Sequence, residues 1–213
     1  LDNGTTAISL GTIGSSAIGG DLTLLTDADQ TISNAITLNG SGAALSVTVD
    51  NANSLTVQAA LTTNAGAITL SADDDVIFTT AGDLTSTNGN ISVSADDDAT
   101  SDAGSGGALT MVDGTVFNAS SGTVTVSADE NITIGQITTT NSSSSAIQLS
   151  STSGNIVDGD TDGSNDLIAT NGTVFIADAE LFGPSGNSIE VNASVTNTSG
   201  VTAVVVTSTA DTT

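Results

Sequence analysis

The side chains of this chain that could do chemistry are almost all carboxylates. The 213 residues include 24 Asp and Glu but no Lys, Arg, His or Cys. Ca²⁺ prefers oxygen ligands such as carboxylates, whereas Ser-His-Asp triads and most transition-metal sites need the missing His or Cys. The residue types therefore favour Ca²⁺ binding over any chemistry that needs a base or a thiol.

Several carboxylates form short runs that return at the same place in a repeat. They are Asp73, Asp74 and Asp75, then Asp96, Asp97 and Asp98, and then Asp129 and Glu130. If successive repeats stack as neighbouring strands, these carboxylates lie about 4.8 Å apart and repel one another by roughly 1 kcal/mol per pair in water. Ca²⁺ would reverse that repulsion, so these residues are candidate Ca²⁺ ligands. The alternative is a solvated acidic turn that caps backbone groups and provides solubility.

A separate stretch looks like the beginning of an EF-hand loop. Asp158, Asp160 and Asp162 alternate with other residues and are followed by Gly163, which favours a single Ca²⁺ site with these three ligands. The twelfth position of such a loop calls for Glu, and here it is Ala169.

The elements that would position these carboxylates are the strands of a repeat. An octet with the pattern Gly, any residue, aliphatic, polar, aliphatic, polar, Ala, Asp begins at Gly66, Gly89 and Gly122, with looser copies from Gly20 and Gly172. Its period of two predicts a strand with one buried face. The Gly, Asn and Asp residues around each octet predict turns. No stretch has the 3.6-residue apolar period of a helix.

The spacing of the octets predicts an all-β fold, a parallel β-helix or β-solenoid. One rung of such a coil needs roughly 20–23 residues, and Gly66 and Gly89 are separated by that length. Longer intervals imply loop insertions at 98–107, 138–145 and 158–166, and Pro184 marks a turn outside the strands. We expect one array over residues 1–213, best defined over 60–180. The alternative is a β-sandwich of Ig-like type, built from short antiparallel strands.

Charge excludes several classes of partner. The net charge is −24, and without a basic residue the chain cannot neutralise phosphates, so nucleic-acid binding is not expected. Anionic lipid is disfavoured for the same reason, and no apolar run reaches the ~20 residues of a membrane span. We expect no enzyme activity, because polysaccharide lyases use Arg or Lys as the base and the Asp residues here belong to repeated turns.

Residues 122–134 read Gly-Thr-Val-Thr-Val-Ser-Ala-Asp-Glu-Asn-Ile-Thr-Ile, and residues 83–91 have the same character. There the chain resembles the filamentous haemagglutinin-like repeat regions of giant bacterial exoproteins. The resemblance covers residues 60–180 and implies a right-handed parallel β-helix, secretion to the cell surface, and adhesion or matrix formation. The chain begins at Leu1 with no signal segment, so we expect it to be processed or cut from a longer polypeptide.

The function that these observations predict is structural and adhesive: a filament, sheath or adhesin stalk, stabilised by Ca²⁺, that associates with itself or with neighbouring repeats of a longer chain. One alternative is a module that binds glycans or a host surface through an exposed Phe or Asn cluster near Phe175 and Phe182. The others are an ice-binding solenoid with outward Thr rows such as Thr69 and Thr125, and a polysaccharide hydrolase with paired carboxylates.

Overall fold

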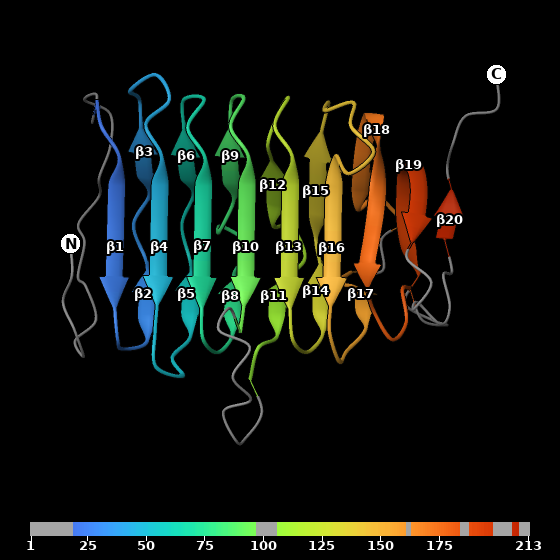
Figure 1. Ribbon diagram of the computed structural model, residues 1–213, viewed down its shortest axis with the longest axis horizontal. Coiled ribbons are helices and arrows are strands. Elements are labelled where there is room, and N and C mark those ends of the chain that lie inside the picture. The colour runs from blue at the N-terminus through green and yellow to red at the C-terminus, as the bar shows by residue number, and fades with distance from the viewer. Residues whose placement is uncertain (1–18, 97–105, 161–162, 184–187, 198–205, 209–213) are drawn as a thin grey trace.

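The computed structural model describes residues 19–96, 106–160, 163–183, 188–197 and 206–208. Their elements are all strands, and all of the strand pairs are parallel. The chain winds into a β-solenoid of about seven turns. In Figure 1 the front strands run downward and the rear strands upward as the chain advances, so the coil is right-handed. The predicted fold class is confirmed, and the antiparallel sandwich is wrong.

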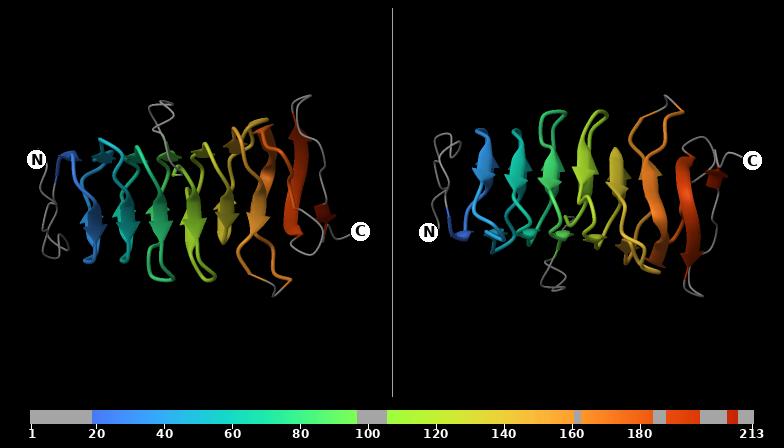
Figure 2. Two further views of the ribbon diagram at one scale, coloured as in Figure 1. Left: turned by 90° about the horizontal axis from the view of Figure 1, so that it is seen from below. Right: turned by 90° about the horizontal axis from the view of Figure 1, so that it is seen from above.

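Each regular turn contributes one strand to each of three columns (Figures 1 and 2). The first column contains the longer strands: β1 (Leu22–Thr26), β4 (Leu45–Val49), β7 (Ile68–Ala72), β10 (Ile91–Ala95), β13 (Val124–Ala128) and β16 (Ile147–Ser151). The second contains β2 (Gln30–Ile32), β5 (Leu55–Val57), β8 (Val76–Phe78), β11 (Leu109–Met111), β14 (Ile132–Ile134) and β17 (Ile156–Asp158). The third contains β3 (Ile36–Leu38), β6 (Leu61–Thr63), β9 (Leu84–Ser86), β12 (Val116–Asn118) and β15 (Gln136–Thr139).

The C-terminal turns depart from this plan. Strand β18 (Leu167–Asp178) pairs with β15 through its first residues and with β16 through its last. It therefore joins the first and third columns into one sheet of 14 strands, which includes β19 (Ile189–Asn197) and β20 (Val206–Ser208). Register shifts interrupt the pairing of β18 with both of its long neighbours. The repeat that is regular in the middle of the chain is thus modified at this end.

The length of a rung agrees with the sequence prediction. In the first column, residues at matching positions in adjacent regular turns are 23 apart, as Asp21 and Ala44 are. The matching residues Asn90 and Thr123 are 33 apart, and the predicted insertion at 98–107 belongs to the connection between β10 and β11, most of which lies outside the described residues. The insertion at 158–166 is the long connection between β17 and β18. The one at 138–145 is wrong: it begins inside β15, and Val124 still pairs with Ile147 at the regular spacing.

The core is a column of aliphatic side chains inside the coil. Alternate residues of each octet point inward, so Ile68, Leu70 and Ala72 are at most 1 % exposed. The rings of Phe78 and Phe117 meet edge to face with centroids 4.7 Å apart, a favourable aromatic geometry. No helix in the described ranges is long and apolar enough to cross a membrane.

The glycines that open the three close copies of the octet, Gly66, Gly89 and Gly122, are required by the stacking of the turns. A Cβ on Gly89 would lie 2.1 Å from the carbonyl oxygen of Gly66, and a Cβ on Gly122 would lie 2.1 Å from that of Gly89. No side chain fits at that distance. The glycine column therefore lets successive backbones approach closely at this corner of the coil.

Candidate metal-binding site

The carboxylates occur almost entirely in the turns. The connections from the first column to the second carry the acidic runs, at the lower edge of the coil in Figure 1. Of the residues predicted to bind Ca²⁺, Asp73, Asp74 and Asp75 connect β7 to β8, and Asp129 and Glu130 connect β13 to β14. Asp96 directly follows β10. Asp97, Asp98 and Asp162 lie outside the described residues.

The three Asp residues after β7 bind other turns of the coil. Asp73 Oδ2 accepts the N–H of Asn51 at 2.5 Å, and Asp74 Oδ2 accepts the hydroxyl of Ser54 at 2.8 Å. Asp75 Oδ1 accepts the N–H of Ala108 at 3.0 Å. These contacts favour the capping interpretation of the acidic turns. Ca²⁺ binding in these turns stays a prediction.

Asp75 belongs to a recurring arrangement, which we call the inter-rung cap. In it, an Asp or Asn one residue before a strand accepts the N–H of the matching residue in the next turn, over 2.8–3.0 Å. The pairs are Asp21 with Ala44, Asp29 with Ser54, Asp75 with Ala108, Asp83 with Val116, Asn90 with Thr123, Asn131 with Asn155, and Asp166 with Glu190. The caps extend the backbone ladder beyond the strand ends, where they give the backbone N–H an acceptor.

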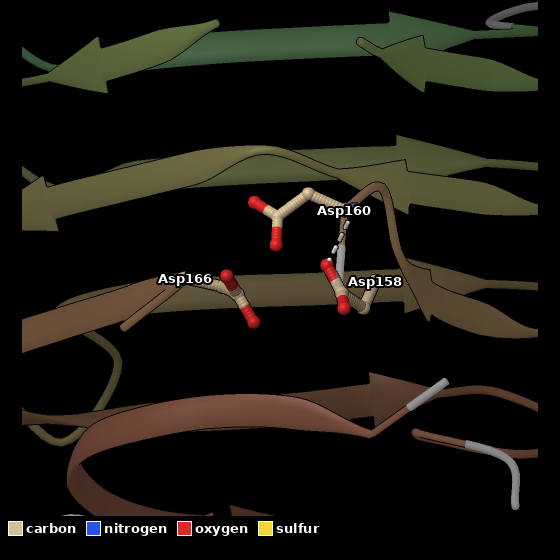
Figure 3. Close-up of side chains that lie close together, drawn as sticks. All are labelled: Asp158, Asp160 and Asp166. Carbon is tan, nitrogen blue, oxygen red and sulfur yellow. Dashed lines mark hydrogen bonds between the residues drawn. The ribbon is translucent and has the colours of Figure 1, made fainter. Parts of the chain in front are cut away.

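One set of carboxylates in the described ranges has a geometry that could hold a metal ion. Asp158, Asp160 and Asp166 each offer an oxygen, and these atoms all lie within 4.8 Å of one another. We call these residues the three-Asp cluster. They surround the connection between β17 and β18 (Figure 3). Asp158 ends β17, Asp160 follows it in the loop, and Asp166 directly precedes β18.

Local hydrogen bonds orient the three-Asp cluster. Asp158 Oδ1 accepts the N–H of Asp160 at 2.8 Å, which closes a tight turn (Figure 3). Asp166 Oδ2 accepts the N–H of Glu190 at 2.8 Å, as an inter-rung cap. The N–H of Gly159 donates to the carbonyl of Ile134 at 2.7 Å, which ties the loop to the preceding turn. The carboxylates are therefore held close together by the backbone of three successive turns.

The electrostatics of the cluster are unfavourable without a cation. Asp158 is 6 % exposed and Asp166 is 2 % exposed, and the chain has no basic side chain that could pair with them. Burial above all, and then the charges of Asp158, Glu190 and Asp160, raise the pKa of Asp166 to about 8, although the N–H of Glu190 acts in the opposite direction. Either a proton or a metal cation can relieve this repulsion.

The donor set fits a hard divalent cation. All of its ligand atoms are oxygens, and Ca²⁺ accepts carboxylates, carbonyls and waters in a flexible geometry. A hollow of about 130 Å³ adjoins Asp160 and Asp166, which leaves room for a few waters. Its other lining residues are Asp113, Gly114, Thr115, Val116, Gly135, Gln136, Ser164 and Asn165.

The burial of the same carboxylates disfavours glycoside hydrolysis at this site. A carboxylic acid with a raised pKa beside an ionised carboxylate is the pair that such hydrolases use. Here, however, Asp158 and Asp166 are almost completely buried, so a sugar ring cannot reach both. The geometry favours ion binding over catalysis.

The spacing of the loop predicted part of this cluster. Asp158 and Asp160 were expected as ligands and lie together, while Asp166 was not among the predicted ligands. Its signal was its position one residue before a strand, the position that Asp83 occupies before β9. Comparison of the chain with family models, with curated proteins and with solved structures gives no match.

Proposed function

We propose that this chain is a structural and adhesive part of a bacterial extracellular filament, sheath or stalk. The observation that carries the proposal is the regular coil, in which each turn continues the previous one through the same strand columns. Such a coil forms a long rod from a small core. The resemblance of residues 60–180 to haemagglutinin-type repeats supports a location at the cell surface.

Self-association, or stacking on neighbouring repeats of a longer chain, follows from the geometry of a coil. The backbone donors and acceptors of each turn point along the axis. Where such a row is unpaired, it can pair with a further strand. Among the described strands, β1, β2 and β3 pair only with the turn that follows them. We propose that a second copy or a neighbouring repeat extends these columns.

Sedimentation and electron microscopy test this role directly. We expect the purified chain at high concentration to form species larger than the monomer, and the images to show rods that lengthen along the coil axis. A chain that stays monomeric at every concentration, with and without Ca²⁺, would rule out self-assembly. Images would also separate a filament from a sheet.

We further propose that Ca²⁺ stabilises the coil at the three-Asp cluster. The support is the convergence of three carboxylates in a chain that offers no cationic side chain. The ion would bridge β17 to β18, because the ligands come from both sides of their connection. Ca²⁺ would then fasten the modified C-terminal turns to the regular coil. We assign no catalytic residue.

A further inference from the structure

One aromatic ring of this chain lies outside the core. The sequence has four Phe and no Trp or Tyr. Phe78, Phe117 and Phe182 are 0 % exposed, whereas Phe175 is partly exposed between the buried Val174 and Ile176 of β18. The prediction of an exposed cluster that includes Phe182 is therefore wrong, and Phe175 alone faces outward.

The neighbours of Phe175 are neutral and can form hydrogen bonds. Phe175 pairs in register with Gln148 in the turn before it and with Thr196 in the turn after it. Thr173 and Ser194 form the next register pair on the same outward face, two residues along each strand. The ring thus stands between an amide and several hydroxyl groups on one sheet face.

A distortion of the repeat occurs beside this ring. In the pairing of β16 with β18, the register shifts between Leu149 and Ser150, so that Ser150 lies opposite Asp178. The register pairs of the first column from β1 to β16 show no such shift. A β-bulge re-aims nearby side chains and is common beside binding sites, so the strand that carries the exposed ring also departs from the repeat.

The surface around Phe175 is uncharged except for Asp178, the exposed last residue of β18. We call the outward side of the first column, together with the second half of β18, the long-strand face (front of Figure 1). Its central row alternates Thr and Ser, with Thr69 in register between Ser46 and Ser92. The other carboxylates near this face stand in the turns at its edges, so most of the face is a neutral strip bordered by negative charge.

We propose that the long-strand face around Phe175 binds a neutral glycan. The ring would stack on the apolar side of a sugar ring, and Gln148, Thr173 and Thr196 would hydrogen-bond to its hydroxyl groups. A few polar groups around an apolar surface are typical of small-molecule recognition. The partner is neutral because the net charge of −24 repels an anionic polymer.

This inference names the partner of the proposed adhesive role, but it can fail independently of self-assembly. The test is electrophoresis of the purified chain through native gels that contain dextran, galactomannan or hydroxyethylcellulose, with polygalacturonate as the anionic comparison. We expect at least one neutral polysaccharide to retard the wild-type chain. Sedimentation of the same samples reports self-association separately.

The deciding variant is Phe175→Thr, which restores the residue type of the surrounding row. We expect it to bind about tenfold more weakly, the loss that corresponds to one aromatic contact. The matched control is Ile77→Thr, an outward apolar side chain in register between Thr56 and Thr110 on the second column. This control should bind like the wild type.

Three outcomes would overturn the proposal: no retardation by any neutral polysaccharide, equal binding by Phe175→Thr and the wild type, or retardation by polygalacturonate alone. The last result would assign glycan binding to the acidic turns through a bridging cation. Circular dichroism of both variants shows whether the coil is retained, and Thr at either position is compatible with a strand.

Discussion

Two aspartates at the same position in different turns show how surroundings decide what a carboxylate does. Asp83 precedes β9 and Asp166 precedes β18, and each caps the N–H of the next turn at 2.8–2.9 Å. Only Asp166 also belongs to a cluster with Asp158 and Asp160. The same kind of hydrogen bond therefore makes Asp83 a simple cap, whereas it also orients Asp166 as a candidate metal ligand.

The first prediction is that Asp166→Asn abolishes the stabilisation of the coil by Ca²⁺. The amide can still accept the N–H of Glu190, but it cannot offer a cation the negative charge of an ionised carboxylate. We expect the melting temperature of the wild type to rise between chelator and millimolar Ca²⁺, and that of the variant to change much less. Differential scanning calorimetry measures both.

The matched control for this experiment is Asp83→Asn, which preserves a cap outside the cluster. It should respond to Ca²⁺ as the wild type does. An equal Ca²⁺ response in Asp166→Asn and the wild type would exclude the cluster as the site, and would direct attention to the acidic runs that follow β7, β10 and β13.

The second prediction concerns pH. The folded chain raises the pKa of Asp166 from 3.8 to about 8, so between these values the folded state binds a proton that the unfolded state has lost. Stability from this group is therefore greatest below pH 4, falls as the pH rises toward 8, and is constant above that. In chelator, the free energy of unfolding of the wild type minus that of Asp166→Asn should decrease over this interval. A difference that is flat with pH would show that the carboxyl ionises normally.

At the scale of the element, the octet encodes a strand together with its corner. Alternating side chains fill the core. The opening glycine leaves room for the backbone of the preceding rung, and the closing Ala and Asp lead into the next corner. The pattern keeps glycine where successive rungs pack most closely. Gly66, Gly89 and Gly122 form one column in which each residue touches the next.

The third prediction is that Gly89→Ala destabilises the coil by about 1–3 kcal/mol, the usual cost of overpacking. The added methyl group would lie 2.1 Å from the carbonyl oxygen of Gly66, so the turns must separate locally. Gly20→Ala is the control, because a Cβ there meets nothing within 4 Å. Urea denaturation compares them, and equal midpoints for the two variants would refute the packing role of the glycine column.

At the scale of the whole molecule, the coil behaves as a stack of interchangeable turns. Leu22 pairs with Leu45, and Leu45 pairs with Ile68, so removal of the intervening turn would bring Leu22 opposite Ile68 with the same side facing inward. The free energy of unfolding of such an array is approximately a sum of the intrinsic stabilities of the turns and the interaction energies between neighbouring turns. Removal of one whole turn should shorten the rod without destroying it.

The fourth prediction follows from this symmetry. Deletion of residues 45–67 should leave a folded and less stable solenoid, and deletion of residues 45–66 should leave one that is less stable than that. The shorter deletion leaves one extra residue at the junction, so the turn must bulge outward if the core side chains are to keep facing inward. Far-UV circular dichroism and thermal melting distinguish the two. If both deletions fold equally well, the register of the core does not govern the stacking.

Much of the fold could be predicted because its signals are local. Period-two alternation in the octets identified strands and their inward faces, and the spacing of Gly66 and Gly89 predicted the length of a turn. The loop at 138–145 was wrongly predicted as an insertion into the rung. The connection from β15 to β16 is long, but the connection from β14 to β15 in the same rung is short, so the rung keeps its regular length. Sequence spacing cannot show such compensation.

By itself, the sequence determined the strands, the coil and the exclusion of cationic chemistry, because composition and short-range periodicity specify them. The octet from Gly172 already placed Phe175 at an outward position, but only the tertiary structure decided which carboxylates meet and that Phe182 lies inside. Asp166 joins Asp158 and Asp160 because the connection between β17 and β18 folds back on itself. Phe182 fills the core because it lies opposite the buried Ile156 of β17. Both results depend on how distant segments align, a quantity that no local pattern carries.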